Sequence, residues 1–110
     1  MARMVSLVPA LLAAALVAAS GCTSPDIDRD AIRATTACQL LCKLSAEQGR
    51  DLSAGPCLGE NLGGGFVCDI AHSPREAVDG DSANQCQAYR NGSAGRFVEL
   101  DEYCDVIAVE

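Results

Sequence analysis

The pattern of hydrophobic and polar positions predicts one long amphipathic helix, over residues 31–48. Apolar side chains such as Ile32 and Leu41 recur there at spacings of three and four, no proline intervenes, and Gly49 stands where a helix C-cap is expected. The acidic and hydroxyl side chains just upstream are candidate N-caps: Ser24, Asp28 and Asp30. We therefore expect the apolar side of this helix to pack on the rest of the domain.

Three short apolar segments predict strands: residues 66–71, 96–100 and 105–109. In the second segment, alternation places Val98 and Leu100 on one face and Phe97 and Glu99 on the other. One face of this strand is therefore expected to lie against the core.

The segments between these elements are rich in turn-forming residues. Residues 50–65 predict a mobile connection pinned by Cys57. Ser82 and Gln85 have the spacing of a capping box, which predicts a short helix over residues 83–90. The predicted fold class is α+β: a small disulfide-rich domain in which one N-terminal helix packs on a few short antiparallel strands.

Residues 1–21 have the composition of a secretory signal peptide. Arg3 supplies a positive charge, residues 4–19 are uncharged and mostly Leu, Val and Ala, and small side chains precede Cys22. The uncharged run of sixteen residues is shorter than a spanning helix of roughly 20 and contains Pro9. A retained transmembrane helix is therefore the less favoured alternative.

The sequence Ala19-Ser20-Gly21-Cys22 resembles a prokaryotic lipobox, in which the cysteine is coupled to diacylglycerol and the chain is cut just before it. Ala19 stands where leucine is usual, and an ordinary signal-peptidase cut would leave the same N-terminus without lipid. Lipidation is favoured by cysteine parity, because setting Cys22 aside leaves six of the seven cysteines to pair. We predict a lipid anchor at Cys22, a tether over residues 22–29 and a disulfide-stabilised domain over residues 30–110.

The remaining six cysteines form the predicted disulfide framework: Cys38, Cys42, Cys57, Cys68, Cys86 and Cys104. Six cysteines allow fifteen pairings, and the sequence selects none of them. Cys38 and Cys42 lie one helical turn apart and face the same way, so we expect each to bond to a different later element. A domain of this size needs such bonds, since each is typically worth about 2–5 kcal/mol in a small secreted domain.

The mature chain is acidic. Removing residues 1–21 takes away Arg3 and none of the fifteen acidic residues, which leaves a net charge of −8 over 89 residues. Nucleic-acid binding and electrostatic docking on anionic lipid both require clustered Lys and Arg, so the composition argues against both. We predict that the protein associates with a membrane through the lipid at Cys22. The sequence does not specify a protein or small-ligand partner.

Asp69, His72 and Arg75 form the candidate functional surface, because they cluster where a predicted strand gives way to a loop. A hydrolase using Ser73, His72 and Asp69 is disfavoured, since a triad is assembled from residues distant in sequence and no nucleophile-elbow pattern is present. In the structural alternative, Asp69 pairs with Arg75 or caps a turn while His72 packs beside Pro74. We assign no catalytic residue.

Other motifs carry less information. Asn91-Gly92-Ser93 is an N-glycosylation sequon, which matters only in a host that glycosylates exported chains. Asp79 and Asp81 could contribute to an acidic cation-binding surface but lack a full ligand set. With a single histidine and no CxxC motif, the sequence predicts no metal site, no cofactor and no thiol oxidoreductase.

Five sequence features also carry a resemblance: the CxxxC spacing at 38–42, GPCL at 55–58, FVCDIAHSPR at 66–75, NQCQAYR at 84–90 and FVE at 97–99. Across residues 38–107 the chain resembles a group of small uncharacterised exported proteins of archaea. The resemblance implies a shared six-cysteine fold and an exported location, and it carries over no catalytic residue.

Three classes of function remain. The favoured class is an extracytoplasmic binding or interaction module held at a membrane by lipid. The second is a lipid-anchored enzyme or enzyme inhibitor, for which residues 69–75 are the first place to look. The third is an acidic cation-binding surface protein using Asp79 and Asp81.

Overall fold

A computed structural model describes residues 26–110, so the predicted signal peptide and Cys22 lie outside the described residues. The main elements are α1 (Arg29–Glu47), β1 (Cys57–Gly59), β2 (Phe66–Ile70), β3 (Arg96–Leu100) and β4 (Val106–Val109). The crossover from β2 to β3, residues 71–95, contains the 3₁₀ turns η2 (Ala77–Gly80) and η3 (Ser82–Asn84) and the one-turn helix α2 (Gln87–Arg90). Within this part of the chain, no helix has the length and apolar character needed to cross a membrane.

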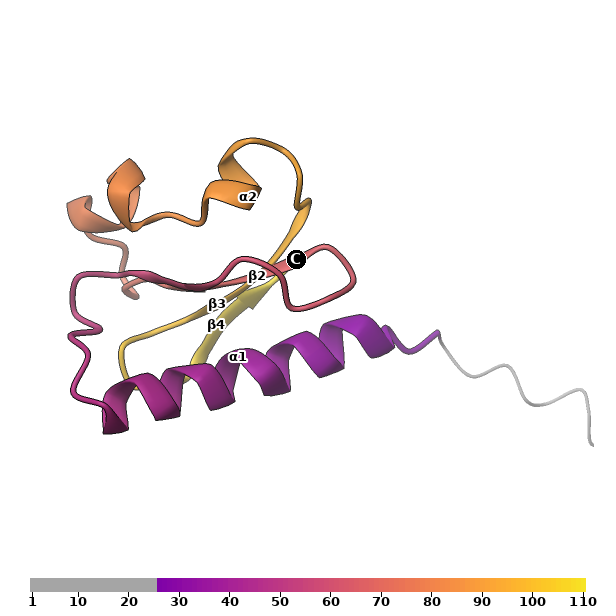
Figure 1. Cartoon of the computed structure of the whole chain (residues 1–110), viewed down its shortest axis with the longest axis horizontal. Helices are drawn as coiled ribbons and strands as arrows, with labels where there is room; N and C mark the ends of the chain where they lie inside the picture. Colours follow the sequence, from indigo (N-terminus) through magenta and orange to yellow (C-terminus); the bar gives the residue numbers. More distant parts are fainter. Residues whose placement is uncertain (1–25) are drawn as a thin grey trace, which may run out of the picture.

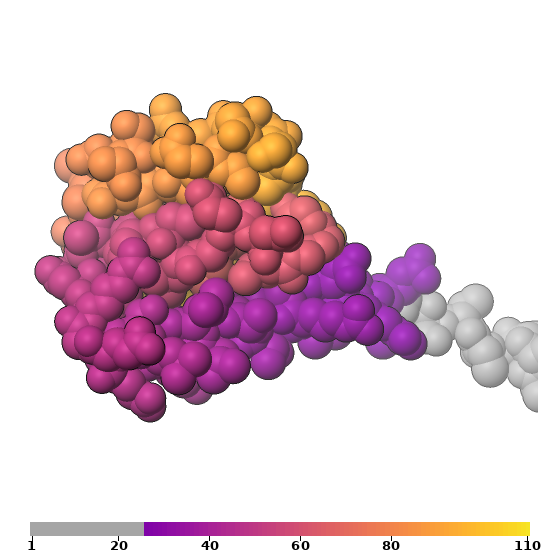
Figure 2. Space-filling view, viewed as in Figure 1, coloured from indigo at the N-terminus to yellow at the C-terminus, as the bar shows by residue number. Residues whose placement is uncertain are grey.

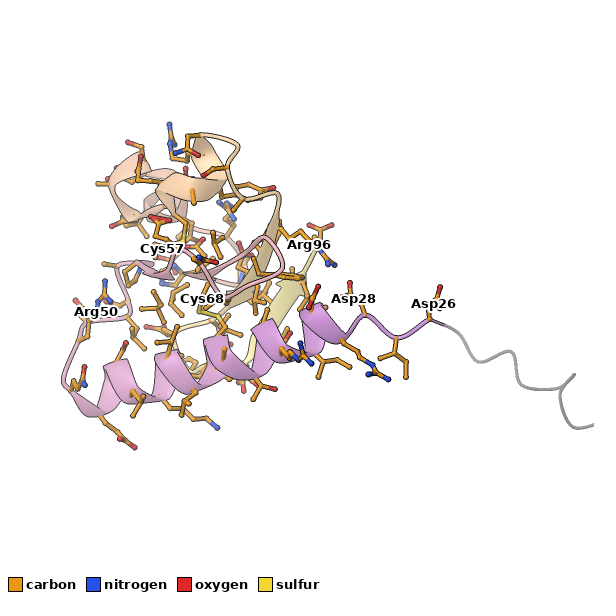
Figure 3. All side chains as sticks on the ribbon, turned by 45° about the vertical axis from the view of Figure 1, so that its right-hand side comes forward. Asp26, Asp28, Arg50, Cys57, Cys68 and Arg96 are labelled. Carbon is orange, nitrogen blue, oxygen red and sulfur yellow. A yellow bond between two sulfur atoms is a disulfide. The ribbon has the colours of Figure 1, made fainter. Side chains whose placement is uncertain are left out.

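Helix α1 begins at a side-chain cap and is tied to the sheet at the same point. Asp28 is the N-cap residue, and its Oδ1 accepts a hydrogen bond of 2.9 Å from the backbone N–H of Ala31. The other carboxylate oxygen of Asp28 pairs with Arg96 of β3, as Figure 3 shows, and the Arg96 guanidinium lies 4.1 Å from the centre of the Phe66 ring. At the far end Gly49 adopts a φ of +80°, which ends the helix as predicted.

The four strands form one mixed sheet in the order β1-β2-β3-β4. The outer pairs are antiparallel, but β2 and β3 are parallel. The α+β class is confirmed, whereas the expectation of antiparallel strands is wrong for this central pair, because the long crossover brings the chain back to the same end of the sheet. The segment expected to be a mobile connection also contains β1, which pairs with β2.

The sheet lies between two covers, with α1 on one face and the crossover on the other (Figure 1). The helix-side core consists of buried side chains from α1 and the strands, chiefly Ala34, Cys38, Cys42, Phe66, Ile70, Val98 and Leu100. On the crossover side, Val67, Cys86 and Ala94 are buried together with part of Phe97. The predicted alternation in β3 is therefore confirmed. Figure 2 shows the crossover as a layer on the opposite side of the molecule from α1.

Three disulfides fasten these layers: Cys38–Cys68, Cys42–Cys104 and Cys57–Cys86. The first two join α1 to β2 and to the turn before β4, which confirms that Cys38 and Cys42 bond to different elements. The third joins β1 to the crossover. Disulfides of this kind are typical of extracytoplasmic proteins.

The predicted helix over residues 83–90 is only partly present. The chain forms the turn η3, then an extended residue at Cys86 with φ −67° and ψ 125°, and then α2. The cap is Asp81 instead of Ser82, since Asp81 accepts a hydrogen bond from the backbone of Ala83. The disulfide of Cys86 to β1 anchors this point of the crossover to the sheet and so interrupts the helix.

Candidate functional site

A cavity of about 210 Å³ lies between the crossover-side face of the sheet and the crossover. Its lining combines carboxylates, one guanidinium, one amide and apolar surface: Val67, Asp69, Arg75, Gln85, Cys86, Tyr89, Phe97 and Glu99. A depression of about 440 Å³ beside Glu60 is larger, but Glu60 is the one charged residue in its lining. Convergent polar groups over an apolar floor are typical of ligand sites, so the smaller cavity is the better candidate.

Two carboxylates meet in this cavity because of the parallel register. Asp69 of β2 lies directly opposite Glu99 of β3. Both side chains stand on the crossover-side face, with Val67 and Phe97 two residues before them on their respective strands. Sequence reasoning singled out Asp69 but missed Glu99. Alternation placed Glu99 on the face shared with Phe97, yet only the strand pairing brings it to Asp69.

The Asp69 carboxyl group is the unusual member of the pair. Its Oδ1 is buried and has no hydrogen-bond partner within the described chain. Burial, followed by the charge of Glu99, raises the pKa of Asp69 from 3.8 to about 7, although the backbone N–H of Ile70 and the charge of Arg75 act in the opposite direction. Near neutral pH the cavity therefore holds a carboxyl group that exchanges between its protonated and ionised forms.

Arg75 enters the cavity from the crossover and neutralises Glu99. Its Nη1 lies 3.6 Å from Oε2 of Glu99, and its Nη2 donates a hydrogen bond of 3.2 Å to the backbone carbonyl of Asp79. The expected pairing of Arg75 with Asp69 is thus replaced by an ion pair with Glu99. This leaves Asp69 as the carboxyl group whose charge is not matched by a direct ion pair.

The remaining walls are aromatic and amide groups. Tyr89 of α2 and Phe97 of β3 pack edge to face, with ring centroids 5.3 Å apart and an interplanar angle of 89°. Gln85 is held in place because its Nε2 donates to the carbonyl of Asp79 and its Oε1 accepts from Arg90. The cavity therefore has one wall from the sheet and one from the crossover.

His72 belongs to a separate cluster that organises the loop after β2. Its Nδ1 lies 2.9 Å from Oδ1 of Asp79, and Oδ2 of Asp79 accepts from the backbone N–H groups of His72 (3.0 Å) and Glu76 (2.8 Å). The hydrogen bond to Asp79 raises the pKa of His72. Burial alone would raise the pKa of Asp79, but the hydrogen bonds from Glu76 and His72 outweigh it and lower that pKa.

This cluster decides two of the sequence hypotheses. His72 has Asp79 as its carboxylate partner, so Asp69, His72 and Ser73 are not assembled as a triad. Asp79 is only 3% exposed and its oxygens are occupied, while Asp81 caps a turn. Asp79 and Asp81 therefore do not present a joint cation-binding surface.

Comparisons with protein-family models, curated proteins and solved structures found no match. The function is accordingly inferred from the geometry of the cavity and its surroundings.

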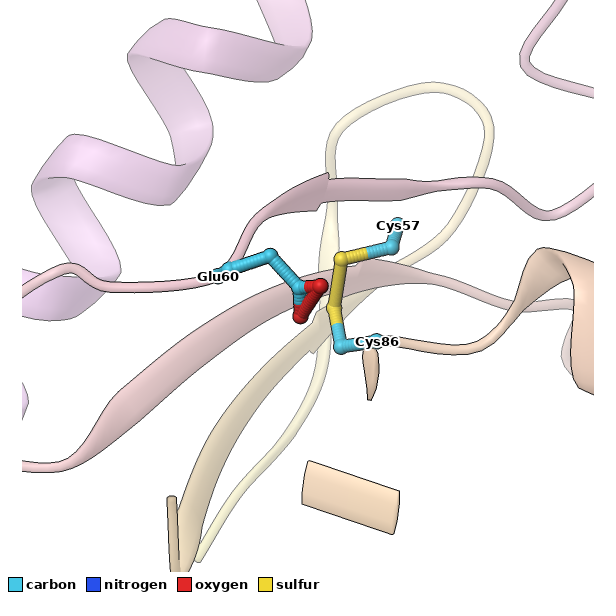
Figure 4. A group of neighbouring side chains, drawn as sticks. All are labelled: Cys57, Glu60 and Cys86. Carbon is cyan, nitrogen blue, oxygen red and sulfur yellow. A yellow bond between two sulfur atoms is a disulfide. The ribbon is translucent and has the colours of Figure 1, made fainter. Parts of the chain in front are cut away.

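A third cluster, Cys57, Glu60 and Cys86, has its potential ligand atoms within 4.8 Å of one another (Figure 4). The two sulfur atoms are bonded to each other, which removes the thiolates that a metal would require. The Glu60 carboxylate accepts hydrogen bonds of 3.1 Å from the backbone N–H groups of Gln87 and Ala88. Glu60 thus caps α2, and the cluster has a structural role.

The sequon at Asn91 lies in the exposed turn after α2. Asn91 Oδ1 accepts hydrogen bonds from the backbone N–H and the hydroxyl group of Ser93. Its exposure is compatible with modification of the side chain amide, and glycosylation of Asn91 stays a prediction.

Proposed function

We propose that the protein is an exported binding protein whose ligand site is the cavity over β2 and β3. The observation that carries this proposal is the unpartnered Oδ1 of Asp69 at a cavity of about 210 Å³. An unsatisfied buried polar atom is costly, and a ligand that donates a hydrogen bond would remove that cost. Phe97 and Val67 would bury the apolar part of such a ligand.

The cavity is also preorganised, which supports binding. The disulfide between Cys57 and Cys86 fixes the crossover wall to the edge of the sheet. Gln85 and Arg75 are oriented by hydrogen bonds to the same backbone carbonyl, that of Asp79. Groups held in place before binding lose little conformational freedom when a ligand enters.

The lipid anchor at Cys22 is part of the proposal. The other six cysteines are all used in disulfides, which leaves Cys22 as the seventh. Because α1 begins at Arg29, the start of this helix would lie within about 25 Å of a lipid at Cys22, given roughly 3.5 Å per extended residue. A ligand site at the membrane surface would serve capture of solutes or partners outside the cytoplasm.

Intact mass spectrometry of the membrane fraction tests the anchor. We expect loss of residues 1–21, a lipid adduct and a mass corresponding to three disulfides, and we expect Cys22→Ser to move the protein to the soluble fraction. Recovery of an unmodified chain with reduced cysteines from the cell interior would contradict both export and anchoring.

A fragment screen followed by ¹⁵N NMR tests the binding site. Cationic, neutral and anionic fragments of up to about ten heavy atoms are added to the full chain, and hits are expected to shift amide signals of β2, β3 and α2. Asp69→Leu should abolish these shifts, whereas Asp105→Leu, at an exposed position, should retain them. Shifts confined to other surfaces would refute the site.

A second candidate function is acid–base catalysis, favoured by one observation. Asp69, with a pKa of about 7, lies opposite Glu99, and a protonated carboxyl group beside an ionised one is the pairing used for general acid and base roles. A screen of glycoside and ester substrates would detect such an activity. Asp69→Asn and Glu99→Gln should remove it while His72→Ala leaves it, because His72 belongs to the loop cluster.

A further inference from the structure

We propose that the cavity binds a small alkylammonium ion, held by the Asp69 carboxylate and by aromatic and apolar surface around it. This inference rests on the proposed function, in that it names the class of ligand for the same cavity.

The balance of charge in the cavity favours a cation. Two carboxylates, Asp69 and Glu99, face a single guanidinium, and Arg75 is already paired with Glu99 at 3.6 Å. A ligand ammonium would supply both the missing hydrogen-bond donor and the countercharge for Asp69. An anionic ligand would be repelled by the carboxylate charge, and a neutral donor would leave Asp69 without a countercharge whenever its carboxyl group is ionised.

The rest of the lining suits the organic part of such an ion. Tyr89 and Phe97, whose rings pack edge to face, both line the cavity, and aromatic faces attract ammonium groups. Val67 supplies aliphatic surface at the floor. A volume of about 210 Å³ accommodates a compact organic ion, since a cavity of roughly 150 Å³ holds a benzene-sized molecule.

The net charge of the whole chain also favours binding of a cation. Fifteen acidic residues against eight basic ones give a formal net charge of −7. Such a field raises the local concentration of cations and speeds their encounter with the protein. Inorganic cations share this attraction, so the apolar part of the ligand provides the selectivity.

Binding should release a proton from Asp69. The charged and titratable groups facing Asp69 are Glu99 from β3, Arg75 and Asp79 from the crossover, and Tyr89 from α2. Its register partner in β1 is a disulfide-bonded cysteine, which does not titrate. An ammonium binds the ionised form of Asp69, whose pKa is about 7, so the apparent affinity should rise with pH up to that value and level off above it.

An NMR titration of the full chain with tert-butylammonium chloride tests this inference, with tert-butanol as the neutral probe of nearly the same shape. An alkylammonium stays charged between pH 5 and pH 8, so changes in affinity over that range report the protein. We expect tert-butylammonium to bind at least tenfold more tightly than tert-butanol at pH 8, and its affinity to fall roughly 100-fold by pH 5. Asp69→Asn should remove both effects, and Asp105→Asn should keep them.

The outcomes separate the inference from the proposed function. Equal affinity for the two probes, or an affinity independent of pH, overturns the assignment of a cation but leaves the cavity as the ligand site. Binding of only neutral or anionic fragments in the cavity would likewise overturn the assignment of a cation and leave the cavity as the ligand site. Failure of every probe and fragment to shift β2, β3 and α2 refutes both. If Asp69→Asn does not fold, the pH series on the unmodified protein still decides.

Discussion

Replacing Asp69 by Asn should stabilise the protein at pH 8 and leave its stability at pH 4 nearly unchanged. In the unfolded chain Asp69 titrates near 3.8, and in the folded protein its pKa is about 7. Between these values the folded state binds more protons than the unfolded state, so stability falls as pH rises through this window. Above pH 7 Asp69 is ionised in both states, and the full cost of burying its charge lowers the free energy of unfolding. Asparagine is neutral throughout and carries no such penalty.

The magnitude follows from the size of the shift. A difference of roughly three pKa units at 1.36 kcal/mol each sets a ceiling of about 4 kcal/mol. Because Asp69 is only partly buried, solvent screening lowers the effect, and we expect a gain of roughly 2 kcal/mol at pH 8. The gain should grow steadily from pH 4 to pH 7.

Guanidinium chloride unfolding of both proteins with disulfides intact, monitored by circular dichroism at each pH unit from 4 to 8, measures this difference. His72 and Asp79 titrate in both proteins, so their contributions largely cancel in the comparison. For Asp105→Asn, at an exposed position, the difference in unfolding free energy from the unmodified protein should not change with pH. If the difference for Asp69→Asn is also independent of pH, the Asp69 carboxyl group is well solvated and burial does not raise its pKa.

Three further predictions concern the scaffold. Converting both Cys42 and Cys104 to Ala removes a bond that spans 62 residues, and chain entropy predicts a loss of about 4 kcal/mol in unfolding free energy, measured by denaturant titration. The ¹H NMR titration of His72 should have a midpoint above 6.5, and Asp79→Asn should lower it. Gly55→Ala should lower the melting temperature in calorimetry, because residue 55 has a φ of +71° and an added Cβ would lie 2.9 Å from Oδ1 of Asp79. A normal His72 midpoint, or an unchanged melting temperature, would contradict the loop geometry described above.

Local patterns in the sequence predicted the elements that carry strong periodicity. Helix α1 and strands β2, β3 and β4 follow from spacing and alternation, and the facing cysteines at 38 and 42 correctly indicated bonds to separate elements. Strand β1 is three residues long and shows no alternation, so it was not distinguishable from its turn-rich surroundings. The parallel pairing of β2 and β3 depends on the path of the crossover, which no local pattern encodes.

Only the part of the site that depends on local sequence pattern was predictable. Asp69 and Arg75 stood out because they flank the end of an apolar segment. Glu99 is thirty positions beyond Asp69 and reaches it only through strand register. Asp79 was expected to contribute to an acidic surface, but its carboxylate accepts hydrogen bonds from the backbone N–H groups of Glu76 and His72 and is buried. These long-range and backbone-mediated contacts carry no signature in residue type.

The three disulfides are distributed unequally between the two sides of the sheet. Two fasten the helix side, and Cys57–Cys86 alone fastens the crossover side, where the cavity lies. Reduction of this third bond would remove the covalent link between the sheet and the wall that carries Gln85 and Tyr89. The helix would still be bonded to the strands by the other two disulfides. On the cavity side the covalent attachment of the crossover to the sheet therefore depends on a single bond, whereas the attachment of α1 to the strands depends on two.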